Sequence, residues 1–145
     1  IIVGLGVAKP VPTNPANFTS PQADLWVAAA GPEMNLLRAV GCWNLYILAY
    51  HAGWTTAPVE IFFTLLAQIN LLLMIFNLLP IGPLDGHYIA PHLLPQRAAR
   101  VYRYYNARFG AMVLLALVFG SLLGLPLLSW LAQLSRTMLD VITLV

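Results

Sequence analysis

Two long apolar runs constrain this chain more than any other feature of its sequence. Residues 59–79 read VEIFFTLLAQINLLLMIFNLL, and residues 109–135 contain no charged side chain. A helix needs about 20 apolar residues to cross the hydrocarbon core of a bilayer, and each run reaches that length. Backbone groups in lipid must find partners within the protein, so the sequence predicts membrane-spanning helices.

The composition agrees with a membrane protein of one domain. Hydrophobic residues make up 60% of the 145 residues and charged residues 8%, against roughly 25% charged in typical soluble domains. The net charge of +2 is too small to predict a nucleic-acid partner, so we expect the partners to lie in the lipid bilayer. Cys42 is the only cysteine, which excludes an intrachain disulfide and indicates a packing role.

The pattern predicts an all-α, polytopic transmembrane domain with about three spans. The first span contains Glu33 and Arg38, and we expect its helix to begin with Pro32 in the first turn. The chain starts with isoleucine and lacks the basic region of a signal peptide, so we expect further sequence upstream. The predicted segments of this single domain, residues 1–145, are a surface loop (1–24), span A (25–52), span B (59–79), a motif and basic loop (80–108), and span C (109–135), broken near its end.

The arginines predict the orientation of the spans. Four of them crowd one short loop: Arg97, Arg100, Arg103 and Arg108. The loop between spans A and B has no Lys or Arg, so the positive-inside rule predicts that the basic loop 97–108 is cytoplasmic. Tyr102, Tyr104 and Tyr105 fit an aromatic belt at that interface, and the arginines are expected to face solvent or lipid headgroups.

The stretch NLLPIGPLDGH, residues 77–87, places a carboxylate directly after span B. Pro80 and Pro83 prevent a regular helix, and irregular backbone at membrane depth is tolerated only inside protein or beside a water-filled cavity. An acid at such a place is costly, so Asp85 is expected to meet a metal ion, a proton or a distant arginine. The structural alternative is that Asp85 caps the next helix and Gly86 permits a tight turn.

Three stretches resemble motifs of the site-2 protease family of intramembrane zinc metallopeptidases. NLLPIGPLDG, residues 77–86, is similar to the family's Asn-x-x-Pro-x-x-x-Leu-Asp-Gly motif. GVAKPVPTNPANF, residues 6–18, resembles its Lys-Pro-Val-Pro loop, and AAAGPEMNLL, residues 28–37, resembles its Ala-Gly-Pro-x-x-Asn helix start. The three occur in the family's order, and they cover the chain from its start to about His87.

The resemblance implies an α-helical membrane core in which Asp85 is the third protein ligand of a zinc ion. The other two ligands would be histidines of an HExxH helix, whose glutamate would be the general base, and zinc would polarise the scissile carbonyl. Asn77 would hold the substrate backbone or stabilise the oxyanion, while an amide that bonds neighbouring helices explains it equally well. Structural motif positions are Pro80, Gly86, Gly31, Pro32 and Asn35, and helix packing or capping is the expected role of Asn35.

The sequence also departs from the family pattern. No HExxH occurs in these 145 residues, so both histidine ligands are expected upstream of this chain. His87 and His92 do not share a helix face, and His51 lies at the far end of span A, so all three are expected to be packed or interfacial. The family usually has a small or apolar residue where Glu33 stands. We expect this acid to pair with Arg38 or to stabilise the helix start.

The predicted function is therefore part of a zinc metalloprotease that hydrolyses transmembrane protein substrates, with a bacterial plasma membrane as the expected location. The alternative is a non-catalytic membrane module, an inactive relative that binds transmembrane helices without cutting them. Half of a transporter would explain the Pro-Gly-Pro break but not the other two motifs. The sequence indicates neither the identity of the substrate nor the oligomeric state.

Overall fold

A computed structural model describes residues 23–144, and all regular structure in that range is helical. The helices are α1 (Ala23–His51), α2 (Ala57–Asn77), α3 (Gly86–Leu93), α4 (Gln96–Leu122) and α5 (Leu127–Ile142). The predicted all-α fold is confirmed for these residues. The predicted surface loop 1–24, with the Lys-Pro-Val-Pro stretch, lies outside the described residues except for its last two positions.

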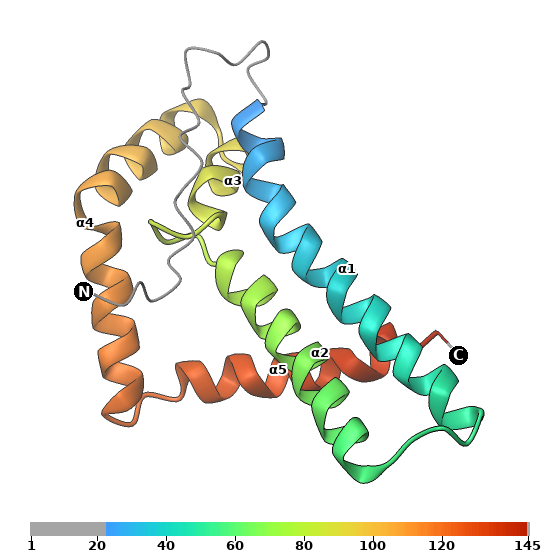
Figure 1. Cartoon of the computed structure of the whole chain (residues 1–145). Coiled ribbons are helices and arrows are strands. Elements are labelled where there is room, and N and C mark those ends of the chain that lie inside the picture. Colours follow the sequence, from blue (N-terminus) through green and yellow to red (C-terminus); the bar gives the residue numbers. More distant parts are fainter. Residues whose placement is uncertain (1–22, 145) are drawn as a thin grey trace, which may run out of the picture.

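Helices α1 and α2 lie side by side and run in opposite directions (Figure 1). Ala39 and Ala67 are fully buried where the helices meet, and such small side chains allow two helix backbones to approach closely. Cys42 packs half-buried against this contact, as predicted. Small residues and the short connection therefore fix α1 and α2 as one hairpin.

The start of α1 differs from the prediction. The helix begins at Ala23, so Pro32 lies inside it and not in its first turn. The residues before Pro32 are rich in alanine, the best helix former, and they continue the helix at the cost of the one donor that proline lacks. Pro32 and Ala28 are buried on the same side of α1. Packing of this face therefore overrides the proline.

Helices α2 and α4 are long and apolar enough to cross a membrane. Only 22% and 6% of the residues in their most apolar stretches are buried within the described structure. The core helix of a soluble protein would be mostly buried, whereas exposed apolar surface of this extent needs lipid or further protein to cover it. Span A corresponds to α1 and span B to α2, each within two residues at either end.

Span C, predicted at 109–135, is divided between two helices. Helix α4 already begins at Gln96 and ends at Leu122, and a turn with Gly124 at φ +110° precedes α5. The Ser121 hydroxyl donates to the Leu125 carbonyl at 3.0 Å and accepts from the Leu128 N–H at 3.1 Å, which stabilises the corner. The expected break therefore falls at residues 123–126, and α5 turns back across α1 and α2 (Figure 1).

One face of α5 completes the core. Its buried residues recur at helical spacing, so they line the side that faces the α1–α2 hairpin. Polar side chains occupy the opposite face. The buried cluster contains Ala39, Ala67, Leu71, Met74, Leu139 and Ile142. The core of the described structure is therefore built from α1, α2 and α5.

Asn44 fastens the end of α5 to the middle of α1. Its Nδ2 donates to the Ile142 carbonyl at 2.7 Å, and its Oδ1 accepts from the Leu144 N–H at 2.7 Å. Carbonyls in the last turn of a helix lack intrahelical donors, so this amide satisfies a group that would otherwise need water. Trp43 adds a bond from Nε1 to the Thr143 hydroxyl at 2.9 Å.

We predict that Asn44→Ala lowers the free energy of unfolding by about 1–3 kcal/mol, because it leaves backbone groups at the end of α5 without partners. Thermal unfolding of the purified protein in detergent measures this change. Gln133→Ala, on the exposed face of α5, serves as the control and should change the stability by less than about 0.5 kcal/mol. Equal stability of the two variants would contradict the role of Asn44.

Candidate functional site

Residues 78–85, the Asp85 loop, connect α2 to α3. Helix α2 ends at Asn77, and Pro80 cannot donate to a further helical turn, as the sequence predicted. The loop makes its own turn bonds, from the Ile81 N–H to the Leu79 carbonyl at 2.8 Å and from the Leu84 N–H to the Ile81 carbonyl at 3.0 Å. These bonds make the loop a succession of tight turns that ends at Asp85.

Asp85 precedes α3 but does not cap it. Its side chain makes no capping hydrogen bond, and its backbone, at φ −59° and ψ −33°, is helical where a capping residue is usually extended. The alternative role as a helix cap is therefore wrong. The carboxylate instead lies against α1, where a Cβ added to Gly31 would come within 2.7 Å of the Asp85 Oδ2.

The environment of Asp85 disfavours an isolated negative charge. Burial raises the pKa of the Asp85 carboxyl group above its usual value, and the charge of His87 opposes this shift only in part. Among residues 23–144, no Lys or Arg side chain lies within 4.0 Å of a carboxylate, so neither residue type in this range neutralises Asp85. Asp85 is thus a half-buried carboxylate with His87 nearby and no Lys or Arg partner in this range, and carboxylate oxygens are among the groups that bind metal ions.

Gly86 follows Asp85 and is buried against the end of α2. A Cβ at this position would overlap the carbonyl oxygens of Leu78 and Leu79. Its φ is not positive, because the glycines with positive φ in the described residues are Gly53 and Gly124. Gly86 therefore permits a close approach between two backbone segments. It also lies within a tight turn, closed by the bond from the His87 N–H to the Leu84 carbonyl at 3.1 Å, without a positive φ.

The two motif asparagines lie on neighbouring helices. Asn77 is the last residue of α2 and is half-buried, and Asn35 is half-buried on α1. Neither side chain makes a hydrogen bond to another residue in the range 23–144. Helix packing or capping was the expected role of Asn35, and an amide bonding neighbouring helices was the alternative role of Asn77. The described contacts do not include such a bond.

His87 and His92 each contact a group other than Asp85, although His87 is near enough to act on the charge of Asp85. His87 Nδ1 lies 2.5 Å from the Leu84 carbonyl oxygen, and its ring packs on Tyr88. His92 Nε2 lies 3.4 Å from the Asp24 carboxylate, which joins α3 to the start of α1. Across residues 23–144, no three His, Cys, Asp or Glu side chains gather as a metal site. The described residues thus contain no complete set of metal ligands around Asp85.

Both roles predicted for Glu33 are wrong. Glu33 and Arg38 are exposed and form no ion pair within the described range. Residues five apart point about 140° from one another around a helix, which separates the two side chains. Because α1 begins at Ala23, Glu33 also lies too far from the helix start to stabilise it.

Sequence reasoning missed the residues that hold the Asp85 loop from the side of α4. The Tyr102 hydroxyl donates to the Pro80 carbonyl at 3.0 Å, and the Asn106 Oδ1 accepts from the Gly82 N–H at 2.9 Å. The aromatic belt remains the predicted place of Tyr102, and the structure adds this bond to the Asp85 loop. The four-residue spacing of Tyr102, Asn106 and Gly110 places them on one helix face, and this spacing is the signal that could have revealed them.

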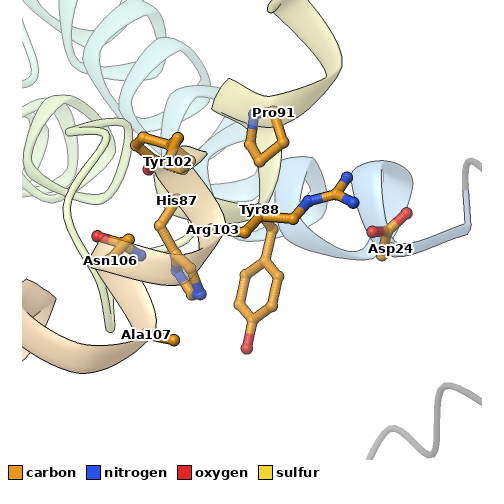
Figure 2. A pocket seen from close by; sticks show the side chains of 8 residues that line it. All are labelled: Asp24, His87, Tyr88, Pro91, Tyr102, Arg103, Asn106 and Ala107. Atoms are coloured by element: carbon orange, nitrogen blue, oxygen red, sulfur yellow. The ribbon is translucent and has the colours of Figure 1, made fainter. Parts of the chain in front are cut away.

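A cavity of about 340 Å³ lies between α3 and α4, beside these residues. Its walls include His87 and Tyr88 from α3 and Arg103 from α4 (Figure 2). Asn106 also borders the cavity, but its amide points toward the Asp85 loop. Asp85 is not among the lining residues, so the cavity and the carboxylate are separate features.

The fold and site define a class: a helical protein with two candidate membrane-spanning helices in the described range and, in the loop that follows the first of them, a half-buried carboxylate that caps no helix. The chain belongs to Peptidase family M50, whose family model matches residues 46–121, more than half of the chain. This match confirms the resemblance to the site-2 protease family. It includes the Asp85 loop and most of α4.

A curated relative extends this result. Over 101 residues the chain is 37% identical to YwhC of Bacillus subtilis (strain 168), a protein named as a zinc metalloprotease. The similarity covers 66% of this chain and 46% of YwhC. The chain thus spans about half the length of this relative. No solved structure matches the chain.

We predict that Gly31→Ala displaces the Asp85 carboxylate without unfolding the protein. The new methyl group would meet the end of a flexible side chain, while alanine favours the helix by up to about 1 kcal/mol. Zinc affinity of the complete protein should fall by about 10-fold, as for residues that orient metal ligands. Chelator competition measures the affinity, and thermal unfolding measures the stability.

Gly41→Ala is the matched control, because Gly41 is also exposed on α1 and no atom lies within 4 Å of its added Cβ. This variant should gain the same helix stability and keep its zinc affinity. If the two alanine variants bind zinc equally well, the contact between Gly31 and Asp85 does not matter for the metal.

Proposed function

We propose that this chain is the part of an intramembrane zinc metalloprotease that supplies the aspartate ligand of the metal centre. The observation that carries the proposal is the Asp85 carboxylate, which is half-buried at a helix break, caps no helix, and has no Lys or Arg partner within residues 23–144. Membership of Peptidase family M50 and the name of the relative YwhC support a metalloprotease.

The available donor fits part of a zinc site. A carboxylate oxygen is a common third ligand beside two histidines, and we propose that those histidines belong to an HExxH helix outside this chain. When bound, zinc acts as a Lewis acid toward the scissile carbonyl and lowers the pKa of its bound water. The role of this chain is to hold the carboxylate ready beside Gly31 on α1.

Two further roles belong to the proposal. Asn77 ends α2 where the Asp85 loop begins, and its amide would donate to the substrate backbone or to a developing oxyanion. The exposed apolar surfaces of α2 and α4 suit a protein that meets its substrates, membrane-spanning helices, within the bilayer. We place it in a bacterial plasma membrane, with residues 97–108 cytoplasmic. The structure corrects the predicted basic loop, because these residues form the arginine-rich first turns of α4.

The arrangement of the termini of the helices is compatible with this orientation. Asp24 at the start of α1 contacts His92 at the end of α3, and α3 also packs against α4. The start of α1, helix α3 and the arginine-rich start of α4 therefore lie at the same end of the molecule (Figure 1). Asp85 lies toward this end, directly before α3.

Asp85→Asn tests the proposal in the complete protein that contains this chain. The amide is isosteric but is a much poorer zinc ligand, so we expect zinc binding and cleavage of a transmembrane substrate to fall by at least about 100-fold. The fold should persist, because the side chain makes no capping bond. Zinc content, substrate cleavage in proteoliposomes and thermal unfolding are measured on the same preparation.

Asp140→Asn is the control, since Asp140 is exposed on α5 and its substitution makes the same change of charge. It should leave cleavage and zinc content at the level of the unmodified protein. Persistent cleavage by Asp85→Asn would refute the proposal. A complete protein that captures transmembrane helices but neither binds zinc nor cleaves them would favour the non-catalytic module.

A further inference from the structure

One face of α4 holds the Asp85 loop through polar groups. Tyr102 donates to the Pro80 carbonyl at 3.0 Å, and one turn later the Asn106 Oδ1 accepts from the Gly82 N–H at 2.9 Å. Figure 2 shows the Asn106 amide directed at the loop and away from the Arg103 side chain. Two backbone groups of the loop, one acceptor and one donor, therefore find their partners on α4.

The next turn of the same face brings the two backbones together. A Cβ added to Gly110 would lie 2.7 Å from the Asn106 Oδ1 and 3.0 Å from the Gly82 carbonyl oxygen. Gly82 and Gly110 are both buried. Any larger residue at Gly110 would displace Asn106 or the loop, so the glycine keeps the loop within hydrogen-bond distance of α4.

The loop can transmit this position to Asp85. Turn bonds link Leu79 to Ile81 at 2.8 Å and Ile81 to Leu84 at 3.0 Å, so few backbone torsions are free between Pro80 and Asp85. After Asp85, Gly86 packs closely against the end of α2, and this contact fixes the position of the chain directly after the carboxylate. A shift at Gly82 would therefore move the Asp85 carboxylate relative to Gly31 on α1.

These contacts contribute little to the central core. The buried cluster consists of residues from α1, α2 and α5, with none from α4. Only 6% of the most apolar stretch of α4 is buried within the described structure. Loss of the Tyr102 or Asn106 bond should therefore loosen the Asp85 loop while the α1–α2–α5 core stays folded.

We infer that Tyr102 and Asn106 are positioning residues for Asp85: α4 holds the Asp85 loop from one side so that its carboxylate stays beside α1, where it can bind the metal. This inference rests on the proposed function for the part that concerns zinc. The position of the loop itself can be measured without any metal, and the two parts can therefore fail separately.

The experiment compares Asn106→Leu with Asn106→Asp in the complete protein. Leucine removes the acceptor for the Gly82 N–H, whereas aspartate keeps an oxygen at that position. Hydrogen exchange measured by mass spectrometry reports the Asp85 loop in the zinc-free protein, and we expect exchange there to rise by about 10-fold or more in Asn106→Leu. Zinc affinity should fall by about 10- to 100-fold in this variant and recover in Asn106→Asp.

Tyr102→Phe should change both measurements in the same direction as Asn106→Leu, because it removes the donor to Pro80. Tyr104→Phe is its matched control, since Tyr104 is exposed on the outer side of α4. This control should leave the exchange rate of the loop and the zinc affinity unchanged. Thermal unfolding of each zinc-free variant shows whether the α1–α2–α5 core has stayed intact.

Unchanged exchange of the Asp85 loop in Asn106→Leu would overturn the inference, whatever the zinc result. A loss of zinc affinity that merely follows a loss of global stability would overturn it as well, because the role would then be structural. If Asp85→Asn binds zinc as tightly as the unmodified protein, the proposed function fails. The exchange measurement then still decides whether α4 holds the loop.

Discussion

The backbone between Pro80 and Pro83 needs hydrogen-bond partners that a continuing helix would otherwise provide, and the rest of the site depends on how they are supplied. Two prolines interrupt the helix in a chain with long exposed apolar surfaces, where unpaired backbone groups are costly. Turn bonds within the Asp85 loop satisfy part of this need. Tyr102 and Asn106 of α4 satisfy two of the remaining groups, and this is why a helix far along the chain determines where Asp85 lies.

Glycines set the distances around this loop. Gly31 leaves room for the Asp85 carboxylate on α1, Gly86 lets α3 begin against the end of α2, and Gly110 lets α4 reach the loop. At each position a Cβ would meet atoms of the loop or of its partners, so the absence of a side chain is what is required. At all three positions glycine is needed for the same reason: it lets two parts of the chain approach closely, and an unusual φ is not involved.

The proposed metal centre is composite. This chain offers one carboxylate, and it spans 46% of the relative YwhC, so the proposal assigns the histidine ligands to the part of the protein outside this chain. With the other ligands in another part of the protein, the described helices have to hold the Asp85 carboxylate in place by their own contacts. Gly31 of α1 contacts the carboxylate on one side, and Tyr102 and Asn106 of α4 bond the Asp85 loop on the other.

Several features could be predicted from the sequence because they depend on local rules. Apolar run lengths predicted the helices that became α1 and α2, and the prolines predicted where α2 ends. Motif order predicted the family. The prolines could not predict that α1 begins at Ala23, well before Pro32. Burial of the face with Ala28 and Pro32 outweighs the loss of one hydrogen-bond donor. The predicted pair of Glu33 and Arg38 was wrong for a different reason. Proximity in sequence suggested the pair, but residues five apart point in different directions around a helix.

The sequence by itself determined that the chain is helical, that Asp85 follows a helix break, and that no HExxH motif accompanies it. Only the tertiary structure decided that the carboxylate lies against Gly31 and does not cap α3, and that Tyr102 and Asn106 hold its loop. The physical reason is that helix propensity and helix breaks depend on neighbours along the chain. Hydrogen-bond partners for an irregular loop come instead from whichever helix packs against it.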